Sequence, residues 1–311
     1  MKGIKNKLML IIGCLFIIIG LLIIFFNIPY SSLKNEFNND LEQTIQNTKI
    51  EKDVFTEDDF RSYPLAIKKY ITNNGFIGNQ KMSYLNIFFE NTDFIQDPKK
   101  IKLKIDYNQY NFAKRPARLA YINSSIYGIP FEGYDYFFNE IGGMKGVIGK
   151  KIQIFNQKGS DIDKGALCTY LAESLFIPTS LLENDIIFEE IDPFNVKATI
   201  NLKGISVSGV FTFNEEYEMI KFYTEDRAAV KDDGSVDYIP WTAKCDNYKR
   251  NKDGINFPNK LKAIWNYPDK DLIYFDGNVK YFSFQFHSLQ KYICTLFSIF
   301  QMILHLQCLR F

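Results

Sequence analysis

The sequence Val196-Lys197-Ala198-Thr199-Ile200-Asn201-Leu202-Lys203 alternates apolar and polar side chains without a break. Successive side chains of a β-strand point to opposite faces of the sheet, so this period of two predicts a strand with one buried and one solvated face. Residues 101–107 repeat the pattern, with Ile, Leu, Ile and Tyr alternating with Lys, Lys and Asp. Because one face is wet, the two segments predict an antiparallel sheet.

Weaker versions of this pattern predict further strands at residues 82–90, 118–127, 131–138, 151–156, 185–191, 205–213 and 217–225. Asn214-Glu215-Glu216 lies between the last two and predicts their hairpin turn. Asp276-Gly277 separates the apolar segments 272–275 and 279–282, and Asp-Gly suits a two-residue turn. We therefore expect a second hairpin there.

Two helices are predicted beside these strands. Residues 65–71 form the first, because Thr56 and Asp59 can make a capping box upstream and Asn73-Asn74-Gly75 can end the helix. Residues 164–176 form the second, with leucines on one face and a proline two residues after its end. Strands and helices do not alternate along the chain, which excludes a doubly wound parallel sheet. The fold class is thus α+β: a mostly antiparallel, strongly curved sheet or half-open β-barrel with two packed helices.

An unbroken apolar run occupies residues 8–26, after Lys2, Lys5 and Lys7. Nineteen helical residues extend about 28 Å, close to the thickness of the hydrocarbon core of a bilayer. Signal peptides have shorter apolar regions and small residues at their cleavage site. We therefore expect an uncleaved signal-anchor helix with its N-terminus in the cytoplasm, single-pass, with the rest of the chain outside. Gly13-Cys14 also fits a loose lipoprotein cleavage pattern, a less favoured alternative.

The chain divides into four predicted segments. Residues 1–29 are the anchor, residues 30–55 a polar stalk, residues 56–285 the β-rich domain and residues 286–311 an apolar or amphipathic tail. The stalk carries an apolar residue every fourth position from 33 to 45, a narrow stripe that predicts a marginal helix with weak contacts or a self-association seam. The tail is expected to lie on the membrane or the domain, to span the membrane, or to be foreign to the fold.

Composition excludes several classes of function. The chain has 37 basic and 36 acidic residues, a balance that argues against nucleic-acid binding. It has two histidines, both in the last 25 residues, which removes most metal sites and any His-based triad from the domain. The glycine-rich residues 142–149 lack the Lys-Ser/Thr ending of a phosphate-binding loop. We expect turns and a bulge there, and neither a cofactor nor a metal. Cys168 and Cys245 could form a disulfide, but free buried thiols are favoured.

Carboxylates are the remaining catalytic candidates. Glu189 and Asp192 cluster at a strand end, where acidic residues are usually solvated. Glu173 lies within an apolar helix, which indicates a partnered charge. Arg227 ends a strand and is the predicted partner, in a structural ion pair.

Aromatic residues are abundant, with 19 tyrosines and 29 phenylalanines. A curved aromatic sheet can enclose an apolar cavity. The alternative is that the rings fill a large core. For the cavity, the expected ligand-binding residues are Tyr136, Phe138, Tyr170, Phe211, Phe213, Trp241 and Trp265.

Residues 170–182 read Tyr-Leu-Ala-Glu-Ser-Leu-Phe-Ile-Pro-Thr-Ser-Leu-Leu, which resembles the RYLAE-x-x-x-x-PTALL signature of a family of uncharacterised bacterial membrane-associated proteins. Residues 63–70 and 254–258 also resemble that family, over about 220 residues in all. Thr169 stands where the family often has Arg. The resemblance implies no known activity. The strand order and the Gly-Ile-x-x-Pro motif are also similar to lipoprotein carriers of the LolA type, which implies a half-open barrel with an apolar concave face for acyl chains.

Three functions follow from these observations. The first is an extracytoplasmic, membrane-anchored protein that binds a lipid-like, apolar or amphiphilic ligand at the cell envelope. The second is a cell-surface hydrolase or transferase that uses Glu173, Glu189 or Asp192. The third is a structural or partner-binding module of a membrane assembly.

Overall fold

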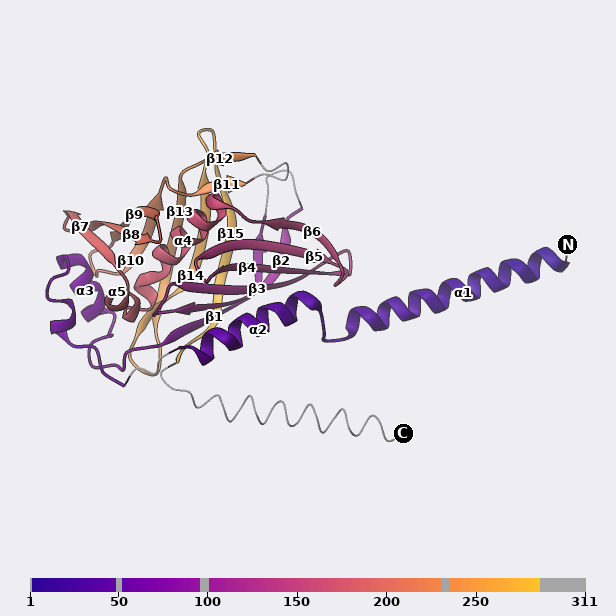
Figure 1. Ribbon diagram of the computed structural model, residues 1–311, viewed down its shortest axis with the longest axis horizontal. Coiled ribbons are helices and arrows are strands. Elements are labelled where there is room, and N and C mark those ends of the chain that lie inside the picture. The colour runs from indigo at the N-terminus through magenta and orange to yellow at the C-terminus, as the bar shows by residue number, and fades with distance from the viewer. Residues whose placement is uncertain (1, 49–51, 96–100, 231–234, 286–311) are drawn as a thin grey trace.

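The computed structural model describes residues 2–48, 52–95, 101–230 and 235–285 (Figure 1). The helical elements are α1 (Lys2–Asn27), α2 (Ser32–Gln46), η1 (Glu57–Phe60), α3 (Leu65–Asn73), α4 (Ser160–Glu173), η2 (Ser174–Phe176) and α5 (Thr179–Glu183). The strands are β1 (Tyr84–Phe94), β2 (Leu103–Phe112), β3 (Ala117–Ile126), β4 (Ile129–Phe138), β5 (Ile141–Ile148), β6 (Ile152–Gln157), β7 (Ile186–Asp192), β8 (Asn195–Leu202), β9 (Ile205–Phe213), β10 (Met219–Thr224), β11 (Ala228–Val230), β12 (Val236–Tyr238), β13 (Trp241–Arg250), β14 (Asn256–Asn266) and β15 (Asp271–Gln285).

Thirteen strands form one sheet in the order β6-β5-β4-β3-β2-β1-β15-β14-β13-β10-β9-β8-β7. Every neighbouring pair is antiparallel, and the pairing of β1 with β15 joins the early strands to the late ones. The sheet is open, because β6 and β7 remain at its two ends. The predicted α+β class with a mostly antiparallel sheet is therefore confirmed.

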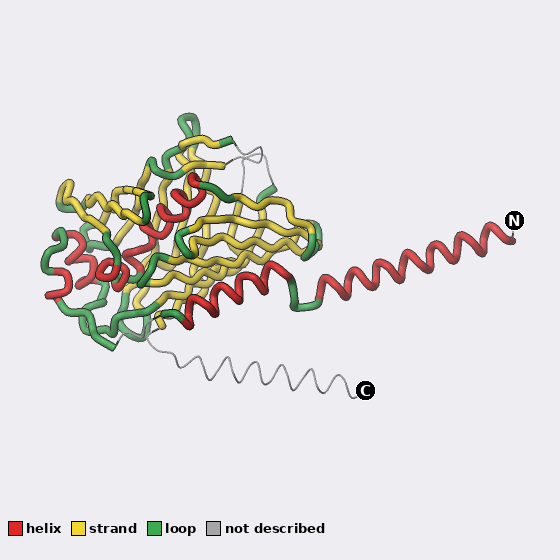
Figure 2. Tube along the Cα trace, in the orientation of Figure 1, coloured by secondary structure: helices red, strands yellow, loops and turns green. Residues whose placement is uncertain are grey.

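Helix α4 lies inside the curve of the sheet (Figures 1 and 2). It contacts β4 and β5 near one end of the strand order and β8 and β9 near the other. Residues on several sides of the helix are buried, among them Leu167, Cys168 and Tyr170. A helix that is buried on several sides needs apolar neighbours all round, and the curved sheet supplies them.

The two faces of the sheet carry separate apolar clusters. On β4, Phe131 and Phe137 belong to the main core with α4, whereas Tyr134 and Tyr136 belong to a second cluster with α2. This assignment follows from the alternation of side chains along a strand. The prediction that residues 31–50 make only weak contacts is therefore wrong. Leu33 and Phe37 of α2 pack on the outer face of the sheet and are only 5% and 4% exposed. The narrow apolar stripe of α2 is enough to hold the helix on the sheet, because the outer face presents aromatic rings to it.

The predicted hairpin at Asp276-Gly277 is also wrong, since β15 continues through it from Asp271 to Gln285. Gly277 pairs with Leu261 of the neighbouring strand. A Cβ atom at this position would lie 2.9 Å from the ring of Phe89 and 2.8 Å from that of Phe275. The glycine thus makes room for two aromatic rings inside a strand.

Other local predictions have mixed outcomes. The capping box of Thr56 and Asp59 is present, and α3 begins at Leu65, as expected. Residues 142–149 lie mostly in strand β5, with the expected irregularity after Gly146. Strands β5, β11, β12, β13 and β14 were not predicted. The predicted tail, residues 286–311, lies outside the described residues.

Helix α1 is long and apolar enough to cross a membrane by its length and composition. It leaves the body of the protein as a separate rod, and its side chains are almost all exposed (Figure 1). The predicted N-terminal apolar helix is therefore present, and its orientation in a membrane stays a prediction.

Candidate functional site

A cavity of about 270 Å³ lies between α4 and the concave face of the sheet. Strands from both halves of the sheet contribute to its walls, because the sheet bends round the helix. Most of the wall is apolar and includes Phe89, Phe94, Ile122, Met144, Met219 and Phe275. Charged residues interrupt this apolar wall: one group is centred on Arg118 and a second on Arg227, and Asp161, Asp237 and Lys262 also line the cavity.

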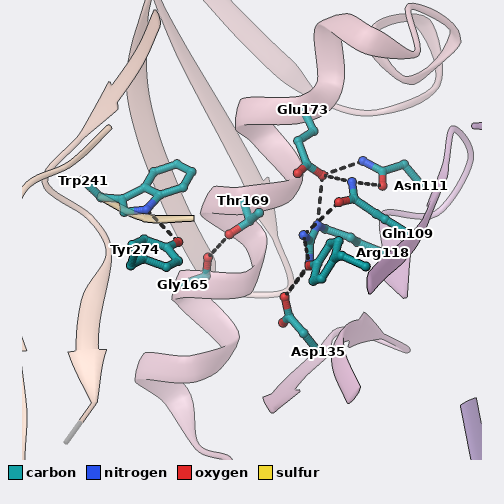
Figure 3. A network of polar contacts seen from close by, with 10 residues as sticks. Gln109, Asn111, Arg118, Asp135, Gly165, Thr169, Glu173, Trp241 and Tyr274 are labelled. Atoms are coloured by element: carbon teal, nitrogen blue, oxygen red, sulfur yellow. Dashed lines mark hydrogen bonds and ion pairs between the residues drawn. The ribbon is translucent and has the colours of Figure 1, made fainter. Parts of the chain in front are cut away.

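Arg118 of β3 holds the first polar group together (Figure 3). Its Nε donates to Glu173 Oε2 at 2.9 Å, and its Nη1 donates to Asp135 Oδ2 at 2.8 Å. Its Nη2 donates to the Tyr107 hydroxyl at 2.6 Å and to Gln109 Oε1 at 3.2 Å. The side chain of Arg118 is 7% exposed. The buried cation is thus surrounded by acceptors from two neighbouring strands and from α4.

The pKa of Arg118 reflects this environment. Burial alone would lower the pKa, but the carboxylate of Glu173, followed by Tyr107 and Asp135, raises it well above its usual range. Burial is also the main reason that the pKa of Tyr107 lies well above its ordinary value. Arg118 therefore stays charged and the Tyr107 hydroxyl stays protonated, which suits a fixed structural network.

Glu173 ends helix α4 and faces this network. Its Oε2 accepts from Gln109 Nε2 and Asn111 Nδ2, both at 2.7 Å, in addition to Arg118. The predicted pairing of Glu173 with Arg227 is corrected, because its cationic partner is Arg118. With three donors on one oxygen, Glu173 is suited to hold α4 on the sheet more than to move protons.

Arg227 forms the second polar group, together with two tryptophans. Its guanidinium carbon lies 4.5 Å from the ring centroid of Trp241 and 5.4 Å from that of Trp265. Its Nη1 is buried and has no hydrogen-bond acceptor among the described residues. A buried donor without an acceptor is uncommon and costs about 1–3 kcal/mol. Arg227 is therefore a lining cation with unused capacity to donate hydrogen bonds.

The two tryptophans are held in place by neighbouring strands. Trp241 pairs with Trp265 across β13 and β14. The Nε1 of Trp241 donates to the Tyr274 hydroxyl at 3.0 Å, as Figure 3 shows, and the Trp265 ring stacks on Tyr274 at 5.9 Å. Both rings are thus held in place by contacts within the sheet.

The predicted ligand-binding residues are distributed over three places. Trp241 and Trp265 line the cavity. Tyr136 and Phe138 lie on the outer face with α2, because their strand turns them away from α4. Tyr170, Phe211 and Phe213 are buried in the main core without reaching the cavity wall. The aromatic residues therefore fill much of the core and also line the cavity, where Trp241 and Trp265 are the members of the predicted set.

The other carboxylates expected to do chemistry lie outside the cavity. Glu189 is exposed on β7 and faces Lys197 at 3.9 Å. Asp192 accepts hydrogen bonds from the backbone N–H groups of Phe194 and Asn195, and the Phe194 bond is the largest contribution that lowers its pKa. Among the described residues no His/Cys/Asp/Glu cluster could hold a metal ion.

Cys168 and Cys245 are free and buried, in agreement with the favoured prediction. Burial raises the pKa of Cys168 to about 12 and that of Cys245 well above its usual value. Both thiols stay protonated near neutral pH and are therefore poor nucleophiles.

Of this network, only Glu173 was predicted from the sequence, and Arg118 and its partners on β2 and β4 were not. A signal was present, because Tyr107, Gln109 and Asn111 place polar groups at every second position of one strand. That row is polar on the side that the strand period assigns to the core. A row of this kind indicates a buried network.

Comparison with known protein families identifies the family of this chain. Residues 53–277 match a family of unknown function, DUF6544. The chain belongs to this family. Membership in DUF6544 brings no assigned activity, and no curated protein matches the chain.

Two solved structures are similar to this DUF6544 chain at low identity. A domain from Vibrio parahaemolyticus, described as an outer membrane lipoprotein-sorting protein, has 12% identity and a TM-score of 0.37, covering 65% of this chain and 86% of its own. A DUF1329 family protein from Desulfovibrio piger has 8% identity and a TM-score of 0.41, covering 73% of this chain and 95% of its own. At such TM-scores neither structure bears on what the chain binds.

Replacing Glu173 by alanine is expected to lower the free energy of unfolding by about 3 kcal/mol, because it leaves Arg118 buried without its main partner. This is the lower end of the range for buried pairs, since the Glu173 side chain keeps 18% exposure. Glu189→Ala, which removes an exposed carboxylate, should change the free energy of unfolding by less than about 0.5 kcal/mol. Denaturant unfolding of the full chain in detergent measures both. Equal effects of the two variants would show that the network does not stabilise the fold.

Proposed function

We propose that this chain is a membrane-anchored binding protein that holds an amphiphilic molecule in the cavity between α4 and the sheet. The observation that carries the proposal is the combination of an apolar wall with one lining cation, Arg227, that has an unsatisfied donor. The apolar part of the ligand lies against the aromatic wall. Its acidic or hydrogen-bond-accepting head lies at Arg227.

The size and lining of the cavity support a small lipid-like ligand. Its volume of about 270 Å³ is close to the lower end of the range of about 300–1,000 Å³ for small-molecule sites. Met144 and Met219 are among the lining residues, and methionine side chains adapt readily to the shape of a ligand. The cavity suits one compact chain or ring better than a bulky substrate.

The charges around the cavity support an acidic head. Asp135 and Glu173 are already paired with Arg118, and Asp161 accepts from the Tyr238 hydroxyl at 2.6 Å. Lys262, another lining cation, lies 3.6 Å from Asp276. Arg227 has stacking rings in place of a carboxylate, and such a guanidinium is well suited to bind a carboxylate or phosphate.

The membrane location rests on α1. Its composition suits a bilayer span, and three lysines precede its apolar run, which favours a cytoplasmic N-terminus and a domain on the outer side of the membrane. A cell-surface enzyme is less well supported, because Glu173 is occupied by three donors and Glu189 and Asp192 face solvent.

Filling the cavity should abolish much of the binding. Ala243 lines the cavity from β13, whereas the next residue, Lys244, is exposed. Ala243→Leu is expected to weaken the binding of a dansyl-labelled fatty acid about tenfold or more, a loss of about 1.4 kcal/mol. Fluorescence titration of the full chain in an amphipathic polymer measures the affinity. Lys244→Leu places the same side chain outside the cavity and should leave the affinity unchanged, and equal affinities of the two variants would contradict the assigned cavity.

The head-group contact is tested separately with Arg227→Met. This variant should weaken the dansyl-labelled fatty acid about tenfold or more, because a hydrogen bond to a charged group contributes about 1.5–3 kcal/mol. The methyl ester of the same probe should bind nearly as before. Lys262→Met removes a lining charge that is already paired and serves as the matched control. If the acid and its ester lose affinity equally, Arg227 supports the tryptophans and does not bind the head.

A further inference from the structure

Two hairpin tips lie at the end of the sheet from which α1 departs (Figure 1). One is the turn between β3 and β4, at Tyr127-Gly128, and the other is the turn between β5 and β6, at Gly149-Lys150. The N–H of Gly149 donates to the carbonyl of Pro130 at 2.7 Å, so the two tips are neighbours. Together they form one short edge of the domain.

This edge contacts the end of the anchor helix. Lys150 is 8% exposed, and its Nζ donates to the backbone carbonyl of Phe25 at 3.3 Å and to that of Ile28. The last carbonyls of a helix lack partners within the helix, and a cation near them is favourable. The Phe26 ring and Ile129 lie 3.6 and 3.9 Å from the position of a Cβ on Gly149. The tips therefore pack on the last turn of α1.

The connection to α1 keeps the domain close to the membrane. Only residues 28–31 separate α1 from α2, whose Leu33 and Phe37 are buried on the sheet. Ser31 is the N-cap of α2: its hydroxyl oxygen accepts from the N–H of Lys34, and the hydroxyl donates to the buried carboxylate of Glu132. This short connection therefore keeps the domain close to the end of the apolar run.

The tips expose apolar side chains at this position. Tyr127 is 90% exposed, Ile129 40%, Ile152 65% and Ile154 49%. Lys151, also exposed, lies beside them. Neighbouring exposed apolar residues commonly mark an interaction surface. Tyrosine is enriched where a membrane meets water, and lysine is favourable near acidic lipid head groups.

We propose that these two hairpin tips insert into the interface of the lipid bilayer beside α1. The apolar run of α1 ends at Phe26, so the residues that contact Phe25 and Phe26 lie at the depth of the lipid head groups. The bilayer covers Tyr127, Ile129 and Ile152, and fixes the sheet at one orientation to the membrane. This inference rests on α1 as a membrane anchor and is independent of the ligand in the cavity.

The test uses the full chain in vesicles of phosphatidylcholine and phosphatidylglycerol, with single cysteines labelled by the environment-sensitive fluorophore NBD. Cys14, Cys294 and Cys308 are replaced by serine, and Tyr127→Cys and Ile152→Cys carry the label in separate variants. Ile187→Cys, on the strand β7 at the opposite end of the molecule, is the control, since Ile187 is 54% exposed, similar to Ile152. We expect blue-shifted emission and quenching by lipids with a shallow nitroxide at positions 127 and 152, and aqueous emission at 187.

A label on native Cys14 alone separates the two parts of the inference. Cys14 in the hydrocarbon together with aqueous emission at both 127 and 152 would overturn the docking of the tips while leaving the anchor intact. Aqueous emission at Cys14 would overturn the anchor and the docking together. Neither result would alter the binding of the dansyl-labelled fatty acid, which reports on the cavity.

Discussion

The ion pair between Arg118 and Glu173 joins helix α4 to the sheet, and the position of the cavity depends on it. The sheet is open at β6 and β7, so backbone pairing does not close it around the helix. Arg118 instead connects the end of α4 to β2 and β4 through a set of short hydrogen bonds. Breaking a buried pair costs far more than forming one gains, so this network fixes one arrangement of helix and sheet. The cavity is the space left where α4 and the strands beside it do not touch.

The same alternation of side chains serves two purposes in the first half of the sheet. Inward residues of β2, β3 and β4 supply the network and the cavity wall, and outward residues supply the aromatic cluster that binds α2. Helix α2 follows α1 after four residues, so the outer face connects the sheet to the apolar helix. We infer that ligand site and membrane contact are held in a fixed relation by one sheet with two apolar faces.

The sequence predicts local structure well here and long-range pairing poorly. Period-two alternation identified strands such as β8 and β9 because each has one wet face. The hairpin prediction at Asp276-Gly277 was wrong because a glycine also occurs inside a strand where aromatic rings leave no room for a Cβ atom. One of these rings belongs to Phe89, which lies far away in the sequence, so the sequence pattern does not reveal it. Glu173 was identified as a partnered charge, but its partner was not Arg227, since the partner is set by which strands are neighbours in the sheet. Of the predicted ligand-binding residues, Trp241 and Trp265 line the cavity, whereas Tyr136 and Phe138 lie on the outer face, because the face of β4 that meets α4 could not be assigned without the register.

We propose that the cavity holds an acidic amphiphile. The most direct measurement is mass spectrometry of small molecules released from the full chain, purified from its membrane and exchanged through fresh detergent. We expect one class of acidic amphiphile, retained in near-equal molar amount with the protein and enriched over its share of the surrounding membrane. Released lipid with the same composition as the bulk membrane, or loss of all lipid on detergent exchange, would contradict it.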